Sequence, residues 1–235
     1  MDKILRILRQ KDRNSGAYWE EHAFETESET ATVATALASV SECSRLSAEN
    51  DEPYRPLIWQ NSCLQKKCGA CAMVVNGMPC LACDTFIKDC RNEKVTIEPL
   101  KKFPVIADLT VDRSIMMDNL KRLEAWLEEG ADIKDTDTVF EASACLQCGL
   151  CLEICPNFYT GGEFAGMAAM TSQARLLSEE SASQHARTSK HYIKSVYNGC
   201  GKSLACRDIC PAGIDIDKLL VRSNAAAVWK RWKRS

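Results

Sequence analysis

The sequence predicts an α+β protein in which a strand-rich first part is followed by an all-α second part. Segments that alternate apolar and polar residues, separated by hairpin-type turns, occur within residues 1–104 of the 235-residue chain. Apolar residues with helical spacing dominate residues 105–235. Most of the 14 cysteines gather in three groups between these elements. We place the domain boundary between residues 104 and 105, where Pro99 and Pro104 follow the last predicted strand.

The first part opens with a predicted β-hairpin. Lys3–Arg9 alternates apolar and charged residues, Ala17–Thr26 carries aromatic side chains, and Asp12–Gly16 between them has the composition of a turn. Thr30–Leu46 then places apolar residues on one helical face, so we expect a helix there. The polar, proline-bearing segment Ser47–Pro56 is a predicted loop that leads to the first cysteine group.

Two further strands complete the first part. Ala72–Val75 is apolar and is followed by Asn76-Gly77, a dipeptide that favours tight hairpin turns. Lys94–Pro99 alternates apolar and polar residues and is the last predicted strand.

The second part is predicted to be helical. From Ile106 onward the spacing favours a helix that ends at Gly130, because apolar residues recur at helical intervals: Met116, Leu120, Leu123 and Leu127. Such a stripe is usually a packing surface, and we assign it no cofactor. Asp132–Thr138 is a polar connector. Further helices are predicted over three segments: Phe164–Leu177, His191–Tyr197 and Ile214–Trp232.

Composition indicates a reduced protein that carries metal. The net charge of -2 and the pI near 6.0 argue against a general nucleic-acid partner. The N-terminal residues lack the apolar stretch of a signal peptide, and no window approaches the roughly 18 consecutive apolar residues of a membrane span. Without signs of secretion, 14 cysteines favour metal binding over disulfides. We expect a cytoplasmic chain that does not itself cross a bilayer.

The first cysteine group has the spacing of a plant-type 2Fe–2S ferredoxin. Cys63, Cys68 and Cys71 form C-x4-C-x2-C, and Cys83 follows after eleven residues. The residues between Cys68 and Cys71 are small, which lets the loop wrap closely around a cluster. Cys80 lies three residues before Cys83, so the spacing leaves the fourth ligand open between these two.

The second group is the bacterial ferredoxin run C-x2-C-x2-C-x3-C-P, made of Cys145, Cys148, Cys151, Cys155 and Pro156. In such runs the first three cysteines bind one cluster and the fourth binds a different one. This run therefore requires a complementary run elsewhere in the chain.

The complementary run extends from Cys200 to Pro211 and has Ser203 where its second cysteine is expected. If the two runs exchange their last cysteines, they form a complete 4Fe–4S set and a three-cysteine set: Cys145, Cys148, Cys151 and Cys210, and Cys155, Cys200 and Cys206. Three thiolates suit a 3Fe–4S cluster. The alternative, a fourth iron on Ser203, is disfavoured because a hydroxyl is a poor ligand for soft metals near neutral pH.

Zinc is the alternative metal for these cysteines. Zinc sites with four ligands do not explain C-x4-C-x2-C or a run that carries a serine, so we favour iron–sulfur clusters. Cys43 and Cys90 are interpreted as small apolar residues, whereas Cys80 stays a candidate substitute for Cys83. The basic, aromatic tail, residues 229–235, suits either a membrane interface or an exposed terminus.

Sequence segments beyond the cysteines resemble the iron–sulfur subunits of succinate dehydrogenase and fumarate reductase. They are L-A-C-D-T-F around Cys83, K-V-T-I-E-P-L-K-K-F-P-V-I-A-D-L-T-V-D from Lys94, and E-F-A-G-M-A-A at Glu163–Ala169. The resemblance implies a β-grasp, plant-type ferredoxin domain followed by an all-α, bacterial ferredoxin-like domain. It also selects Cys83 as the fourth 2Fe–2S ligand.

The same resemblance implies partners and an electron route. The subunit would lie between an FAD-bearing flavoprotein, where succinate and fumarate interconvert, and a membrane anchor, where quinone reacts. Electrons would pass from flavin through the 2Fe–2S, 4Fe–4S and 3Fe–4S clusters to quinone, in the tricarboxylic acid cycle or in anaerobic respiration. The chain itself would be peripheral on the inner face of the cell membrane, held there by its partner subunits.

Departures from the family pattern concern the quinone. Ubiquinone-reducing members commonly carry a tryptophan, a histidine and a lysine at the positions of Thr160, Gly201 and Asn224 here. Pro156 is retained and marks the expected quinone vicinity. The resemblance therefore favours menaquinone over ubiquinone. The alternatives are a thiol or other non-quinone donor, or a free-standing multi-cluster ferredoxin without a fixed partner.

Overall fold

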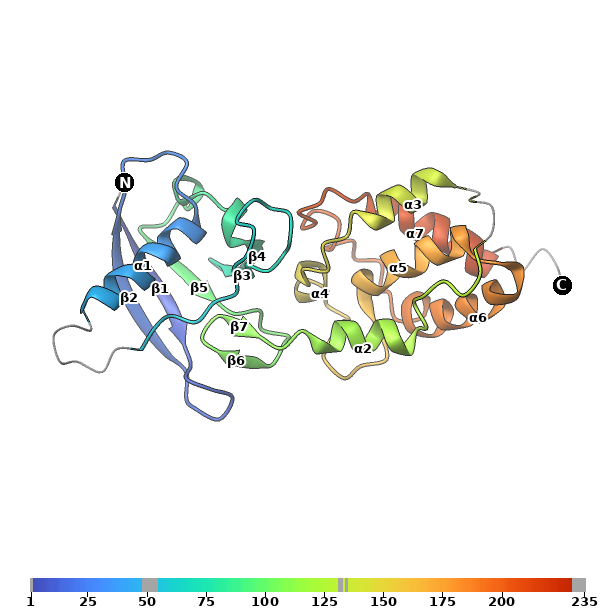
Figure 1. Ribbon diagram of the computed structural model, residues 1–235, viewed down its shortest axis with the longest axis horizontal. Helices are drawn as coiled ribbons and strands as arrows, with labels where there is room; N and C mark the ends of the chain where they lie inside the picture. The colour runs from blue at the N-terminus through green and yellow to red at the C-terminus, as the bar shows by residue number, and fades with distance from the viewer. Residues whose placement is uncertain (1, 48–54, 131–132, 134, 230–235) are drawn as a thin grey trace. The chain divides into compact units, whose positions relative to one another are not determined.

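The computed structural model describes residues 2–47, 55–130, 133 and 135–229. The chain divides into two compact units, Met1–Asp112 and Arg113–Ser235. This division falls eight residues after the boundary expected from the sequence at residue 104. Figure 1 shows the strands together with helix α1 in the first unit and the helices α2 to α7 in the second.

A five-stranded sheet with the order β2-β1-β5-β3-β4 forms the centre of the first unit (Figure 1). Its first hairpin, β1 (Asp2–Arg9) and β2 (Tyr18–Glu25), is antiparallel and confirms the predicted pair. The turn between them is organised by Asp12, whose carboxylate accepts the backbone N–H groups of Asn14 and Ser15 at 2.9 and 3.0 Å.

The two further strands predicted for this part, now β3 and β5, are also present. β3 (Ala72–Val75) and β4 (Met78–Leu81) form a hairpin. Asn76 and Gly77 in its turn have φ of 49° and 80°, as a type I′ turn requires. β5 (Lys94–Glu98) pairs in parallel with β1 and antiparallel with β3.

In the part of the first unit that the structure describes, one α-helix and two short 3₁₀ turns accompany this sheet. α1 (Val33–Ser47) matches the predicted helix and crosses the sheet (Figure 1). The turns η2 (Ala82–Asp84) and η3 (Ile87–Asp89) follow β4. Apolar side chains from the sheet and the helix form the core and are fully buried, among them Leu5, Ile7, Val33, Leu37, Val95 and Ile97.

The expectation of a helix from Ile106 onward is wrong. The chain first forms a small hairpin of β6 (Val105–Ala107) and β7 (Thr110–Val111). Asp108 adopts a φ of 44° in its turn and accepts the backbone N–H of Gln10 at 3.0 Å, just after β1. This tertiary contact holds the segment in an extended form that its apolar spacing does not predict.

The helix that follows is shorter than predicted. α2 spans Ser114–Arg122, and Glu124, with a φ of 49°, ends it. Gly130 is therefore not its last residue. Leu123 is buried as expected, whereas Leu127 lies beyond the helix and is 42% exposed.

Helices packed around α5 (Gly166–Glu179) form the second unit (Figure 1). This helix contacts α2 and each of the other α-helices of the unit: α3 (Thr136–Ser143), α4 (Leu150–Glu153), α6 (Ala182–Tyr192) and α7 (Ile216–Asn224). Two π-helical turns, η4 (Ile193–Tyr197) and η5 (Ala225–Trp229), continue α6 and α7. In the described part of this unit, β-pairing is limited to an isolated bridge between Gly130 and Glu180.

The helix starts of the second unit have local causes. Asp135 accepts the N–H of Thr138 at 3.1 Å and caps α3, and Asp215 accepts that of Lys218 at 3.0 Å and caps α7. The predicted helices over 164–177 and 191–197 are confirmed, as is the described part of the last helix. The second of these begins earlier than predicted, at Ala182, and α3 and α4 were not predicted. No helix of the described residues is long and apolar enough to cross a membrane.

Candidate iron–sulfur sites

The first cysteine group lies on a loop that directs its backbone N–H groups at sulfur. Leu64, Lys66 and Gly69 have positive φ, which turns the loop repeatedly. Four amides point at three sulfurs within 3.3–3.4 Å: Gln65 and Lys67 at Cys63, Lys66 at Cys83, and Ala70 at Cys68. N–H donors of this kind stabilise negative charge on sulfur, as a thiolate-bound cluster requires.

The pKa shifts of the thiols show that the cysteines of this group lie close together. The N–H groups of Gln65 and Lys67 lower the pKa of the Cys63 thiol to about 7. Burial raises the pKa of Cys71 to about 12, and the nearby Cys83 and Cys68 add to the shift by repulsion. The structure thus brings Cys83, together with Cys68 and Cys71, to one place.

Cys80 has a different neighbour. It lies on β4 opposite Met73, and burial raises the pKa of its thiol to about 11, with a further contribution from the charge of Cys90. Cys90 is buried and directs its thiol at the carbonyl of Phe86. The side chain of Cys43 lies outside the described residues.

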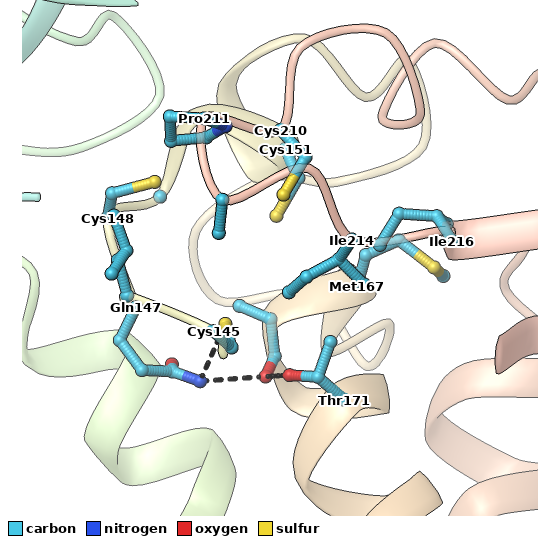
Figure 2. Close-up of a pocket in the computed structure, with 14 residues that line it drawn as sticks. Cys145, Gln147, Cys148, Cys151, Met167, Thr171, Cys210, Pro211, Ile214 and Ile216 are labelled. Atoms are coloured by element: carbon cyan, nitrogen blue, oxygen red, sulfur yellow. Dashed lines mark hydrogen bonds between the residues drawn. The ribbon is translucent and has the colours of Figure 1, made fainter. Parts of the chain in front are cut away.

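The first three cysteines of the second group and the last cysteine of the third group line one cavity (Figure 2). Its wall contains four cysteines, Cys145, Cys148, Cys151 and Cys210, beside the apolar side chains of Met167, Ile214 and Ile216. Burial, followed by repulsion from the other thiols, raises the pKa of Cys151 well above its usual value, and Cys148 shifts in the same direction. Four neighbouring thiols cannot easily all ionise by themselves, because their negative charges repel one another. A cationic iron–sulfur core would compensate these charges, so this set of thiols fits such a cluster.

A side-chain donor also reaches this cavity. Gln147 Nε2 donates to the sulfur of Cys145 at 3.4 Å and to the carbonyl of Ala168 at 3.0 Å (Figure 2). The hydroxyl of Thr171 donates to the same carbonyl at 2.9 Å.

The third site assembles Cys155, Cys200 and Cys206. Burial, and then the charges of Cys155 and Cys200, raise the pKa of Cys206 to about 11. Ser203, in the position of the missing cysteine, is exposed, as is Pro156. The structure therefore brings the three cysteines of the predicted set together.

Packing fixes the loop that carries Cys200. Asn157 Nδ2 donates to the carbonyl of Gly199 at 2.8 Å and so links the two cysteine runs. A Cβ at Gly199 would meet Phe164 at 2.6 Å, and a Cβ at Gly201 would meet Asn157 at 2.8 Å. The glycine at position 201 is thus compatible with this close packing.

A buried hydrogen bond joins two helices near Cys200 of the third site. Tyr192 is fully buried and donates to Asn224 Oδ1 at 2.8 Å. Burial raises the pKa of Tyr192, and the charge of Cys200 adds to the shift. Each partner directly precedes a π-helical turn, η4 or η5.

The donor sets suit iron–sulfur clusters. In the described part of the chain, no three His, Cys, Asp or Glu side chains are arranged to hold one single metal ion. The three groups instead present thiols, with N–H donors aimed at sulfur in two of them and apolar walls around the cavity. This chemistry is that of cluster binding.

Sequence reasoning missed Gln147, Asn157 and Tyr192. Gln147 occupies a spacer position of the C-x2-C pattern, and Asn157 follows Pro156 directly. Their proximity to the cysteine runs is the signal that could have identified them.

Comparisons with known proteins agree with this arrangement. Residues 3–118 match the family model of a 2Fe–2S iron–sulfur cluster binding domain, and residues 141–214 match that of a 4Fe–4S dicluster domain.

The chain is 36% identical to the succinate dehydrogenase iron–sulfur subunit of Bacillus subtilis over 186 residues, covering 74% of this chain and 73% of the relative. It is 31% identical to the fumarate reductase iron–sulfur subunit of Wolinella succinogenes over 183 residues, covering 70% and 75%. Its fold is similar to a chain of the Mycobacterium smegmatis Sdh1 complex, with a TM-score of 0.69 and 23% identity over 98% of this chain and 97% of that one.

Proposed function

Because the chain belongs to the family of iron–sulfur subunits of succinate dehydrogenases and fumarate reductases, we propose that it transfers electrons between the FAD of a flavoprotein subunit and a membrane quinone. Chemistry on the dicarboxylate belongs to the flavoprotein partner, and a membrane anchor is the second partner. The chain would then be peripheral on the inner face of the cell membrane.

The fold supports two ferredoxin-like domains. A sheet with a central parallel pair, β1 and β5, crossed by α1, favours a β-grasp assignment for the first. Helices around α5, with cysteines in the loops between them, favour an all-α, bacterial ferredoxin-like assignment for the second.

The proposed ligands follow the cysteine groups. Cys63, Cys68, Cys71 and Cys83 would hold the 2Fe–2S cluster, and Cys145, Cys148, Cys151 and Cys210 would hold the 4Fe–4S cluster. Cys155, Cys200 and Cys206 would hold a 3Fe–4S cluster. When bound, these clusters accept and release single electrons.

The protein's part is to hold sulfur and to set its surroundings. The amides of Gln65 and Lys67 stabilise negative charge on Cys63, and apolar residues such as Met167 and Ile214 exclude water from the second site. Near the third site, Pro156 would face a quinone, with menaquinone favoured by the departures at Thr160 and Gly201.

One observation carries the proposal: Cys210 lies in the same cavity as Cys145, Cys148 and Cys151, although 59 residues separate it from Cys151 (Figure 2). This is the exchange of last cysteines that two interlocked ferredoxin runs require.

Electron paramagnetic resonance tests the proposal on the full chain, purified without oxygen from iron-replete cells with its neighbouring subunits. We expect a 3Fe–4S signal in the oxidised sample, a 2Fe–2S signal in the reduced one, and a co-purifying flavoprotein. Zinc in place of iron, or no acid-labile sulfide, would contradict it. Clusters without a flavoprotein would favour a free-standing ferredoxin.

Replacement of Ser203 by cysteine tests the third site. A thiolate at this position completes a four-cysteine run, so we expect the oxidised 3Fe–4S signal to disappear and a reduced 4Fe–4S signal to replace it. The matched control is Ser195→Cys, a buried serine outside the run. An unchanged 3Fe–4S signal in the Ser203→Cys variant would show that Ser203 does not occupy the missing corner.

A further inference from the structure

The side chain of Gln147 makes a contact that the cysteine pattern does not require. Its Nε2 lies 3.4 Å from the sulfur of Cys145, which is a normal distance for a nitrogen that donates to sulfur (Figure 2). Gln147 occupies a spacer position between Cys145 and Cys148 and is itself half-buried.

The orientation of the Gln147 amide is fixed by a second contact. The carbonyl of Ala168, 3.0 Å away on α5, can only accept a hydrogen bond, so the group that faces it must be the NH₂ and not the oxygen. One N–H then serves Ala168, and the other is available to the sulfur. The backbone of Gln147 is left-handed, with φ of 50°, and this conformation directs its side chain from the spacer position toward both contacts.

The amide also separates two spaces. Cys145, Gln147 and Thr171 line the cysteine cavity, and the same three residues line a neighbouring groove. The groove is also lined by residues of α2, of the loop after it, of α3 and of α5, among them Trp126 and Arg175. Gln147 is thus part of the wall between the cavity and this groove.

We propose that Gln147 is a positioning residue that raises the reduction potential of the cluster held by Cys145 and shields that cluster from the groove. The proposal rests on the proposed function, because it takes Cys145 as a cluster ligand. A reduced cluster carries one more negative charge than an oxidised one, and its sulfur is therefore the stronger hydrogen-bond acceptor. An N–H donor at Cys145 stabilises the reduced form more than the oxidised form, which shifts the potential upward.

Two substitutions separate the two roles. Gln147→Leu removes the donor and keeps most of the bulk, whereas Gln147→Ala removes both. The control is Gln184→Leu. Gln184 also joins two segments through its amide, accepting the N–H of Glu128 at 3.1 Å and donating to the carbonyl of Trp126 at 2.7 Å, so its loss perturbs packing in the same unit.

The potential is measured by a redox titration of the cluster-loaded complex with dithionite, followed by electron paramagnetic resonance. In Gln147→Leu we expect the reduction equilibrium of the 4Fe–4S cluster to shift about tenfold toward the oxidised form, which is about 59 mV for a one-electron couple. The 2Fe–2S potential is an internal reference and stays unchanged. Gln184→Leu leaves both potentials at their parent values.

Shielding is measured by the rate at which ferricyanide bleaches the cluster. We expect faster bleaching in Gln147→Ala and the parent rate in Gln147→Leu. A parent 4Fe–4S potential in Gln147→Leu would overturn the tuning role, and a parent bleaching rate in Gln147→Ala would overturn the shielding role. A parent complex without any 4Fe–4S signal would instead refute the proposed function.

Discussion

Asp108 is a fully buried carboxylate whose charge is matched by several donors. Its Oδ1 lies 3.1 Å from Arg9 Nε and 2.8 Å from Arg55 Nη2, and it also accepts the amide of Gln10. Its Oδ2 accepts the amide of Ile58 at 2.9 Å. Arg9 is also buried and pairs with Glu20 through Nη1, so the loss of the Asp108 charge would weaken the compensation of this buried cation without removing it.

We expect Asp108→Asn to destabilise the first unit by about 2–3 kcal/mol, because the buried donors around Asp108 lose a charged acceptor while Glu20 still pairs with Arg9. Asparagine tolerates the positive φ of this position, so the change tests the charge and not the backbone. Thermal unfolding followed by circular dichroism should show a Tm lower by roughly 10 °C or more.

The matched control is Asp112→Asn, which removes the same charge from a pair with Arg13, whose side chain is 55% exposed. An exposed pair contributes about 0–1 kcal/mol, so its Tm should change little. Equal losses in the two variants would contradict the view that burial makes the Asp108 charge important.

At the scale of single residues, the sequence identifies candidate metal ligands better than it identifies hydrogen-bond partners. The cysteines are recognisable because metal ligation fixes their spacing along the chain. Gln147 and Asn157 are not, because each donates to a carbonyl that lies 21 or 42 residues away in the sequence. Such partners are set by how helices pack, which no local pattern records.

Among the elements, α5 shows how one glycine permits close packing of two helices. Gly166 begins this helix with a φ of +76°, and a Cβ built on it would lie 2.1 Å from Leu152 Cδ2 on α4. Leu152 is itself buried, so it has little room to move. Because α4 lies between Cys148 and Cys155, this contact also positions the second cysteine run.

We expect Gly166→Ala to cost about 3 kcal/mol, from left-handed strain of about 1–2 kcal/mol and overpacking of about 1–3 kcal/mol. The control, Gly161→Ala, carries the same backbone strain, because Gly161 has a φ of +90°, but a Cβ there has nothing within 4 Å. Thermal unfolding of the cluster-loaded chain should therefore show the larger loss for Gly166→Ala. Indistinguishable Tm values would argue that α4 adjusts to the added methyl group.

The same scale explains why one predicted helix is too long. Helical spacing of apolar residues continues from Met116 to Leu127, yet α2 ends at Arg122. Beyond it, Gln184 on α6 holds the carbonyl of Trp126 and the amide of Glu128, and these tertiary bonds replace the helical ones. Periodicity detects an apolar face but not a competing partner for the backbone.

On the scale of the whole molecule, two units each contain their own cysteine sites. Cys63, Cys68, Cys71 and Cys83 all belong to the first unit, and the cysteines of the other two sites all belong to the second. The sequence predicts this division because strand-like and helical patterns change along the chain. The compact units divide after Asp112, because the β6–β7 hairpin joins the first unit through Asp108, a contact that spans 98 residues.

Because the sites belong to separate units, we expect the loss of a ligand in one unit to leave the site of the other unit intact. Cys151→Ala removes a thiol from the cavity that Cys145, Cys148 and Cys210 also line, so we expect the 4Fe–4S signal to be lost. Cys151 is also close to Cys206, so the third site should weaken as well. The reduced 2Fe–2S signal should remain, because its ligands and the core that supports them lie within residues 2–112.

Electron paramagnetic resonance of the oxidised and reduced variant decides the outcome, with Cys90→Ala as the control. Cys90 is buried in the first unit and lies outside the proposed ligand sets, so its replacement should leave all three signals in place. Loss of the 2Fe–2S signal in Cys151→Ala would mean that the first unit depends on the second for its folding, and two independently supported units would then be the wrong description. Retention of the 2Fe–2S signal would show that the 2Fe–2S site depends on contacts within its own unit. It would then persist although the 4Fe–4S cluster of the second unit is lost.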